Sequence, residues 1–260
     1  MTDDEDFALF VKKIREFTTI DLNQYKEAQM RRRLTTLRTK KGYVTFVAFF
    51  DAISKDKNLL YEFLDRMTIN VSEFWRNANR WEILEKRFIP EMLQQNRKIK
   101  CWSAACSTGE EPYTLAMIIA EIRGGLQDIQ VSATDIDDGA LEKARNGLYL
   151  DRSIRDVPAS YLKKYFKQDG IMYNITADLK AVVKFQKQNL LLDKFDINHD
   201  LIVCRNVMIY FTEEAKHLLY QKFAQALKPG GILFVGSTEQ IFTPGQYMLE
   251  PVDTFFYRKK

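Results

Sequence analysis

Apolar residues among the first 70 positions recur at the three- and four-residue spacing of amphipathic helices. The runs span residues 7–17, 25–37, 46–53 and 60–67. Gly42 is a stop signal after the second run. These runs predict a small all-helical domain over residues 1–70, a connector over residues 70–79, and a further helix from about residue 80 to 95.

From residue 98 onward, short apolar runs alternate with helical segments, which is typical of a parallel sheet covered on both faces. The expected strands are residues 99–104, 129–134, 182–186, 201–204 and 232–236. Between the first two, Thr108 and Pro112 are start signals for a helix over residues 110–122. The predicted fold class is therefore α/β.

Two stretches depart from this simple alternation. Residues 165–188 hold polar positions, an Asp169-Gly170 turn signal and short strand-like pieces, so we expect a small β insertion there. The alternating residues 254–257 predict an antiparallel edge strand near the C-terminus.

The composition is that of an ordinary globular protein and disfavours membrane and disulfide-rich classes. The chain has 260 residues, of which 46% are apolar and 28% charged, and no apolar run is long enough to cross a bilayer. The first residues are acidic where a secretory signal would be basic and then apolar, so we expect a cytoplasmic protein. Cys101, Cys106 and Cys204 are expected to be reduced thiols rather than disulfide or metal ligands.

Basic residues gather in one stretch, although the net charge of +4 is too small to indicate nucleic acid by itself. Against a single acid, Glu27, residues 26–41 hold Lys26, Arg31, Arg32, Arg33, Arg38, Lys40 and Lys41. An acidic partner would suit this stretch. Charge runs are also common on solvated helix faces that have no partner, and both interpretations stay open.

The segment between the first predicted strand and its helix is a candidate ligand-binding loop. In Rossmann-like sheets a ligand sits against the backbone of this turn. Only Gly109 is present where dinucleotide folds have three glycines, so a phosphate ligand is disfavoured. Glu110 and Glu111 would instead suit the ammonium group of an amino-acid-like cofactor, although acids in a first helical turn can simply complement the helix dipole.

Polar residues also follow two other predicted strands, at the edge where open α/β sheets bind ligands. Asp135 stands where a carboxylate accepts both hydroxyls of a ribose, whereas Asp137 is better described as a helix cap. Arg205 and Asn206 end the fourth predicted strand. As alternatives, Arg205 could pair with a local acid and the nearby Tyr210 could be a half-buried packing residue.

Together these features resemble the CheR family of chemotaxis receptor methyltransferases. The matching motifs run in the family's order and cover nearly the whole chain. They are Asn70-x-Ser72-x-Phe74-Trp75-Arg76, Trp102-Ser-Ala-Ala-Cys-Ser-Thr-Gly-Glu-Glu-Pro-Tyr113, Ala133-Thr-Asp-Ile-Asp137, Asn189-Leu190, Cys204-Arg-Asn-Val-Met-Ile-Tyr-Phe211 and Leu227-Lys-Pro-Gly-Gly231. Ser72 and Trp75 replace the threonine and phenylalanine common at these positions, but the hydroxyl and the aromatic ring remain.

The resemblance implies an α/β, Rossmann-like class I S-adenosylmethionine-dependent methyltransferase with a small all-helical N-terminal domain and an inserted small β-subdomain. The implied domains are a helical domain over residues 1–70, a linker over 71–80 that contributes to the cofactor pocket, and a methyltransferase domain over 81–260 with its β-subdomain at about 165–188. The family methylates glutamate side chains of chemotaxis receptors to methyl esters, leaving S-adenosylhomocysteine and using no metal. The implied partner is the cytoplasmic helical region of these receptors, met by a monomer that binds no nucleic acid and does not insert into the membrane.

The resemblance also assigns roles to individual residues. The implied cofactor-binding residues are Asn70, Ser72, Arg76, Glu111, Asp135, Asn189, Leu190, Arg205 and Asn206. Glu111 would lie near the methionine amino group and Asp135 on the ribose, while the catalytic residues Arg76 and Tyr210 would stand nearest the transferred methyl group. In the N-terminal domain, the residues expected to meet the receptor are Arg31, Arg33 and Arg38.

This chemistry requires no general base, because a glutamate carboxylate with an ordinary pKa of about 4.3 is already ionised at neutral pH. The two histidines, His199 and His217, lie in no motif. Two alternatives stay open. A nucleic-acid methyltransferase would share the fold, the cofactor and a basic patch, although residues 205–208 lack the polar-Pro-Pro-aromatic turn that goes with base amino methylation. A receptor-binding module without activity would keep the fold alone.

Overall fold

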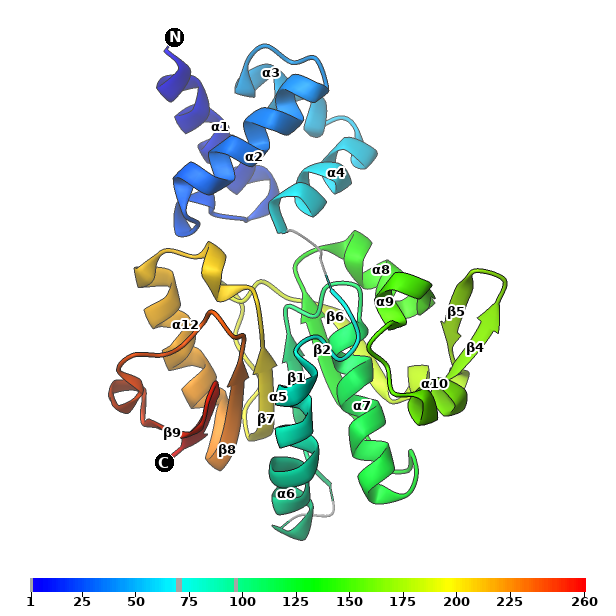
Figure 1. The fold of residues 1–260 in the computed structure, drawn as a ribbon. Helices are drawn as coiled ribbons and strands as arrows, with labels where there is room; N and C mark the ends of the chain where they lie inside the picture. The colour runs from blue at the N-terminus through cyan, green and yellow to red at the C-terminus, as the bar shows by residue number, and fades with distance from the viewer. Residues whose placement is uncertain (1, 69–71, 96–97) are drawn as a thin grey trace. The chain divides into compact units, whose positions relative to one another are not determined.

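The computed structural model describes residues 2–68, 72–95 and 98–260, which form two compact units. The first unit comprises Met1–Asn70 together with Tyr210–Leu218, and the second comprises Val71–Ile209 with Leu219–Lys260. Figure 1 shows both units and labels many of their helices and strands. The return of residues 210–218 to the N-terminal unit is a feature that the predicted domain over residues 1–70 did not include.

The first unit is helical, as predicted. Its helices are α1 (Asp3–Thr18), the short η1 (Leu22–Gln24), α2 (Glu27–Lys40), α3 (Phe46–Ile53) and α4 (Lys57–Thr68). Thr2 and Glu5 form a reciprocal capping box at the start of α1. The core is aromatic: the ring of Phe10 lies within about 6 Å of those of Phe46 and Phe63.

Residues 210–218 join this unit through backbone contacts. The amide of Lys26 donates to the carbonyl of Tyr210 at 2.9 Å, and Tyr25 and Phe211 form an isolated antiparallel bridge. The rings of Tyr25 and Phe211 are 5.0 Å apart. Tyr210 is therefore held by the start of α2.

The second unit is built on a seven-stranded sheet within the described residues, in the order β6-β2-β1-β7-β8-β10-β9. The strands are β1 (Cys101–Ala104), β2 (Val131–Asp135), β6 (Val183–Lys187), β7 (His199–Cys204), β8 (Leu227–Val235), β9 (Leu249–Asp253) and β10 (Phe256–Lys259). The first five in the sheet order pair in parallel, and the last two turn antiparallel. This confirms the α/β fold class and the five predicted parallel strands, with small shifts at their ends.

Helices cover both faces of this sheet (Figure 1). Besides three short helices near the small sheet, the unit has α5 (Ala78–Ile83), η2 (Leu84–Phe88), α6 (Ile89–Gln95), α7 (Glu110–Arg123), α8 (Asp138–Asn146), η3 (Met208–Tyr210), α12 (Glu213–Ala226) and η4 (Pro244–Tyr247), some of which extend into the first unit. On β1, Ser103 bonds Glu111 of α7, while its neighbour Trp102 packs on Phe223 of α12. Because successive strand residues face opposite sides, α7 and α12 cover opposite faces.

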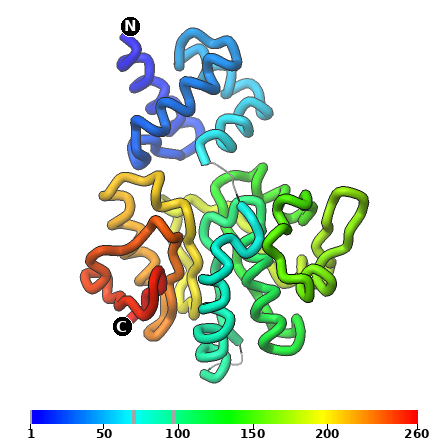
Figure 2. Tube along the Cα trace, viewed as in Figure 1, coloured from blue at the N-terminus to red at the C-terminus, as the bar shows by residue number. Residues whose placement is uncertain are grey.

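The C-terminal strands differ from the prediction in their order. The predicted edge strand over residues 254–257 corresponds to β10, which pairs with both β8 and β9 and is therefore internal. The edge is β9, whose Pro251 has no backbone donor and suits an outer position. Figure 2 shows this red hairpin beside the orange β8.

A second sheet of three strands, counted over the described residues, has the order β3-β5-β4. It comprises β3 (Leu148–Leu150), β4 (Phe166–Asp169) and β5 (Met172–Ile175), with α9 (Asp151–Ile154), α10 (Ala159–Tyr165) and α11 (Ala177–Ala181) nearby in the chain. The predicted insertion at residues 165–188 therefore differs at both ends. Strand β3 escaped notice because it is only three residues long, and residues 183–187 belong to the large sheet as β6.

Candidate functional site

The carboxyl ends of β1, β2 and β7 lie next to one another, because these strands are parallel neighbours. The loop after β1 winds tightly: Ala105, Ser107 and Gly109 all have positive φ angles. A Cβ at Gly109 would come within 2.9 Å of the Cβ of Ala144. The single glycine of the motif is thus required for the loop to pass close to α8.

Glu111 lies in the first turn of α7 and points back into this edge of the sheet. The hydroxyl of Ser103 donates to its Oε1 at 2.8 Å, and Nη1 of Arg205 is 3.5 Å from its Oε2. Burial raises the pKa of Glu111 to about 7, although the positive charge of Arg205 opposes the rise. The predicted alternative for Arg205, pairing with a local acid, is therefore realised within the site itself.

Arg205 ties the end of β7 to the segment before α5. Its Nη2 donates to the backbone carbonyl of Arg76 at 2.7 Å and to Oδ1 of Asn77 at 3.0 Å. The guanidinium lies over the rings of Trp81 and Phe234, and only 4% of the side chain is exposed. Burial lowers the pKa of Arg205. A cation this buried is held in place from several sides at once.

The residues before Arg76 are anchored to the same unit. Ser72 hydrogen-bonds Glu110, which also accepts a 2.7 Å hydrogen bond from the Thr108 hydroxyl. Phe74 is fully buried against the rings of Tyr149 and Phe166. Glu110 and Glu111 thus differ in role, because the first supports the chain segment at Ser72 and the second faces Arg205.

Asp135 ends β2 and is also buried. Its Oδ2 accepts from the amide of Ser107 at 2.8 Å and its Oδ1 from the amide of Asp137 at 3.0 Å. Burial raises its pKa to about 6, against the effect of these backbone donors. The amide of Ile136 is a third backbone donor to this carboxylate, whose remaining lone-pair capacity is available to a ligand hydroxyl. Asp137 caps α8 by accepting from Gly139 and Ala140, which confirms its predicted role.

The remaining predicted site residues are the cofactor residues Asn70, Asn189, Leu190 and Asn206 and the catalytic Tyr210. Asn206 follows Arg205 with a positive φ of 60°, and Asn189 and Leu190 follow β6, where the amide of Gln188 donates to the Asp135 carbonyl. Leu190 is buried. Asn70 lies outside the described residues. Tyr210 belongs to the first unit, where the guanidinium of Arg33 lies 5.2 Å from its ring centroid.

Glu239 is a buried residue of this edge that the sequence analysis missed. It follows β8 in the segment Gly236-Ser-Thr-Glu239, and its carboxylate accepts from the amides of Asn206, Met208 and Gly236. The one available signal was an acid placed shortly after the fifth parallel strand, where ligands of open α/β sheets bind.

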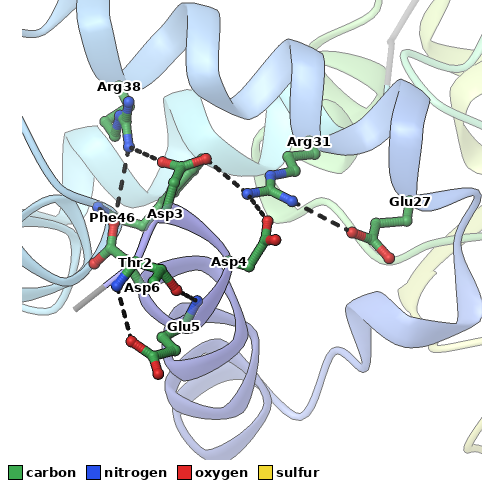
Figure 3. A network of polar contacts seen from close by, with 9 residues as sticks. All are labelled: Thr2, Asp3, Asp4, Glu5, Asp6, Glu27, Arg31, Arg38 and Phe46. Atoms are coloured by element: carbon green, nitrogen blue, oxygen red, sulfur yellow. Dashed lines mark hydrogen bonds and ion pairs between the residues drawn. The ribbon is translucent and has the colours of Figure 1, made fainter.

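The basic stretch of α2 is engaged within its own unit. Arg31 lies 2.7 Å from both Asp3 and Asp4, and Arg38 lies 3.8 Å from Asp6 (Figure 3). Arg33 donates to the carbonyls of Gln29 and Met67. Acids of α1 that are distant in sequence therefore neutralise part of the basic stretch, and the receptor contact expected of these arginines stays a prediction.

The donor set at this edge fits an adenosylated amino acid. Asp135 offers two oxygens to a ribose diol, and Glu111 offers a carboxylate to an ammonium group. The tight loop at Gly109 passes close to α8 and leads into the first turn of α7, where ligands of such sheets bind. Fold and site together define a class I S-adenosylmethionine-dependent methyltransferase.

The sequence comparisons narrow this class to one family. Residues 70–256 match the CheR methyltransferase SAM binding domain, and residues 5–68 match the CheR methyltransferase all-alpha domain. The chain belongs to the CheR methyltransferase family.

Full-length relatives agree with this assignment. A chemotaxis protein methyltransferase of Listeria innocua is 43% identical over 98% of this chain and 98% of that protein. One from Borreliella burgdorferi is 34% identical over 92% of this chain and 89% of its own length. A solved TehB-like SAM-dependent methyltransferase from Corynebacterium glutamicum has 17% identity and a TM-score of 0.39, covering 70% of this chain and 93% of that chain.

The described part of the chain has neither a membrane-spanning helix nor a metal-binding cluster. Over residues 2–68, 72–95 and 98–260, no helix has the length and apolarity needed to cross a membrane. The same residues hold no cluster of three or more His, Cys, Asp or Glu side chains arranged to hold a metal ion. Cys101, Cys106 and Cys204 are free and buried.

Proposed function

We propose that this protein transfers a methyl group from S-adenosylmethionine to glutamate side chains of chemotaxis receptors, forming methyl esters and S-adenosylhomocysteine. Family membership supports the cofactor and the setting in chemotaxis. The single observation that carries the proposal is the buried pair of Glu111 and Arg205, with the half-buried Arg76 acting on Glu111 by its charge and Asp135 at the end of β2, at the edge where such sheets bind ligands. The protein acts as a cytoplasmic monomer without a metal.

On the cofactor side, Glu111 holds the ammonium group and Asp135 holds the two ribose hydroxyls. Arg205 contacts both Glu111 and the Arg76 carbonyl, so it fixes the start of α7 relative to the segment before α5. The other residues proposed to line the pocket are Asn70, Ser72, Arg76, Asn189, Leu190 and Asn206. S-adenosylmethionine, when bound, supplies a methyl group already activated by its sulfonium.

On the substrate side, the protein needs to orient a carboxylate and exclude water rather than move a proton. A glutamate side chain is ionised at neutral pH, so no base is required. Arg76 aligns that carboxylate, and Tyr210 shares the task by one hydrogen bond. Because a carboxylate and a sulfonium lose charge as they react, a drier site favours the reaction.

The receptor surface proposed for Arg31, Arg33 and Arg38 requires an exchange of partners. Arg31 and Arg38 already face acids of α1. An acidic receptor helix would have to compete with Asp3 and Asp4, which are 69% and 86% exposed and therefore weakly held. These arginines can serve a receptor only if such surface pairs open readily.

The deciding experiment is incubation with methyl-labelled S-adenosylmethionine and receptor-containing membranes, followed by mild alkali. We expect the label on the receptor to be released as methanol, since carboxyl methyl esters hydrolyse under these conditions. Asp135→Asn is the matched control for cofactor dependence. Alkali-stable label on nucleic acid would support the rival nucleic-acid methyltransferase, and undetectable S-adenosylmethionine binding by calorimetry would support a module without activity.

A further inference from the structure

Glu239 connects two loops at the ligand-binding edge of the sheet. Its Oε2 accepts from the amide of Asn206 at 2.7 Å and from that of Gly236 at 2.8 Å, while its Oε1 accepts from the amide of Met208 at 2.6 Å. The amide of Ile209 is a further donor to it. One side chain, 4% exposed, thus gathers backbone donors from the loop after β7 and from the end of β8.

The loop after β7 cannot satisfy these donors by itself. Asn206 has a φ of 60°, a left-handed conformation that turns successive amides toward the interior. A buried amide without an acceptor destabilises the fold, because it has lost its hydrogen bonds to water. Only a group with several lone pairs on two oxygens meets three or four donors at once, and an ionised carboxylate is that group.

Gly236, directly after β8, leaves space for this carboxylate. A Cβ at Gly236 would collide with Oε2 of Glu239 and would lie 2.8 Å from the amide nitrogen of Asn206. Gly236 therefore allows the two loops to approach each other closely. Glycine is needed at position 236 because a side chain there would collide with the Glu239 carboxylate.

The charge of Glu239 also acts on the neighbouring ionised groups. It adds to the rise that burial causes in the pKa of Glu111 and opposes the fall that burial causes in the pKa of Arg205. The charged and titratable groups that interact with Glu111 include Arg205, Glu239, Arg76, Cys106 and Cys204. Glu239 thus touches the site in two ways, through backbone geometry and through charge.

We propose that Glu239 is a positioning residue for the cofactor site, which holds the loop of residues 205–209 so that Arg205 and Asn206 meet the bound cofactor, and which places a second negative charge near Glu111. This rests on the proposed cofactor site but not on the identity of the methyl acceptor. Glu239 donates nothing to the reacting atoms. It acts through Arg205, Asn206 and Glu111.

The test is S-adenosylmethionine affinity of Glu239→Gln, measured by calorimetry between about pH 5.5 and 8.5, alongside thermal unfolding. The glutamine keeps the shape but turns one acceptor into a donor that faces backbone N–H groups. We expect affinity at pH 8 to fall about ten- to a hundredfold, the loss expected when polar contacts to a ligand are misaligned or broken. The pH midpoint of binding should also move downward, because Glu111 loses a negative neighbour.

A matched control lies near the amino end of β7, at the opposite end of the parallel strands from the ligand-binding edge. Asp200 is also buried, and its carboxylate accepts from the amide of Lys100 at 2.7 Å. Asp200→Asn should lower the unfolding temperature but keep both the wild-type affinity of the folded protein and its pH midpoint. Loss of affinity without the midpoint shift in Glu239→Gln, or wild-type values for both, would overturn the proposal.

A second variant covers the case in which Glu239→Gln does not fold. Gly236→Ala keeps the charge but displaces the carboxylate, so affinity should fall while the pH midpoint stays close to that of the wild type. Unchanged affinity in Gly236→Ala would count against the positioning role. All these readings use the cofactor alone, so a failure to esterify glutamate would overturn the proposed function and leave the role of Glu239 standing.

Discussion

Arginine and carboxylate side chains meet in both units of the molecule, but in opposite surroundings. In the first unit, Arg31 lies 2.7 Å from Asp3 and from Asp4, whose side chains are largely exposed (Figure 3). In the second unit, Arg205 and Glu111 are separated by 3.5 Å, with 4% and 13% of their side chains exposed. The shorter nitrogen–oxygen distance therefore belongs to the solvent-exposed pairs.

The difference shows why distance does not rank these pairs. Exposed pairs contribute about 0–1 kcal/mol because solvent screens them. Buried pairs attract more strongly, but each ion has lost its hydration, so the pair as a whole adds little to stability. The raised pKa of Glu111 reflects this cost of burial. Ligand binding therefore explains the presence of this costly buried cluster better than stability does.

Arg205→Met should have the largest effect on this comparison. It leaves Glu111 buried without its cationic partner and the Arg76 carbonyl without its donor. We expect the free energy of unfolding at pH 8 to fall by about 3–5 kcal/mol. Arg31→Met, at the exposed network, should lower it by about 0–1 kcal/mol. Urea unfolding of both variants measures the contrast.

A double variant separates charge from packing. Adding Glu111→Gln to Arg205→Met removes the stranded charge, so part of the lost stability should return. Equal losses in Arg205→Met and Arg31→Met would show that burial does not distinguish the two clusters.

Asp135→Asn should come next in size. An asparagine offers one carbonyl oxygen, and its amide group would face the backbone donors of Ser107 or Asp137. We expect S-adenosylmethionine affinity to fall about ten- to a hundredfold at pH 8, since a site built to bind two hydroxyls loses an acceptor. Calorimetry measures this, with Asp200→Asn as the buried-carboxylate control. Wild-type affinity in Asp135→Asn would show that Asp135 does not bind the ribose.

The pH dependence of the buried cluster should reveal two opposite trends. Folding raises the pKa of Glu111 from 4.5 to about 7 and that of Asp135 from 3.8 to about 6. The folded chain therefore binds these protons more tightly, so both groups contribute less to stability as pH rises through these windows. Cofactor binding needs the ionised forms, so affinity should fall about tenfold per pH unit below about 7.

Calorimetry and thermal unfolding of the protein without cofactor, over the same pH series, measure the two trends. Glu111→Gln provides the control, because its affinity should be low throughout and should lose the inflection near pH 7. Affinity that stays constant from pH 8 to about pH 6 would show that the ionisation of Glu111 does not matter for binding.

The contrast between the units also explains what could be predicted from the sequence. The helices of the first unit and the parallel strands followed from apolar periodicity, because burial on one face or both imposes it. Asp135, Arg205 and Glu111 stood out because polar residues directly follow apolar strands at known places. Glu239 did not, since its partners are backbone amides of a distant loop, and backbone donors leave no residue pattern.

The ion pairs of the basic stretch could not be predicted for a related reason. A count of charges between residues 26 and 41 is local, whereas Asp3, Asp4 and Asp6 reach Arg31 and Arg38 only after α1 packs beside α2. Similarly, β6 carries the alternation of a half-covered strand and was partly assigned to the small insertion, although it pairs with β2. Pairing across the chain is a tertiary property that spacing alone does not encode.

The smallest expected effect belongs to Asp4→Asn in the exposed network. Arg31 keeps Asp3 and Glu27 as partners, so the free energy of unfolding should change by less than about 0.5 kcal/mol, and less still in high salt. If acids of α1 compete with an acidic receptor helix for Arg31, removing one of them should raise the initial rate of receptor methylation at low salt. Asp51→Asn makes the same charge change at the Lys13 pair, away from α2, and should leave the rate unaltered. Equal rates for both variants would mean that Arg31 serves only the packing of α1 on α2, because a docking residue must respond when its competitor is removed.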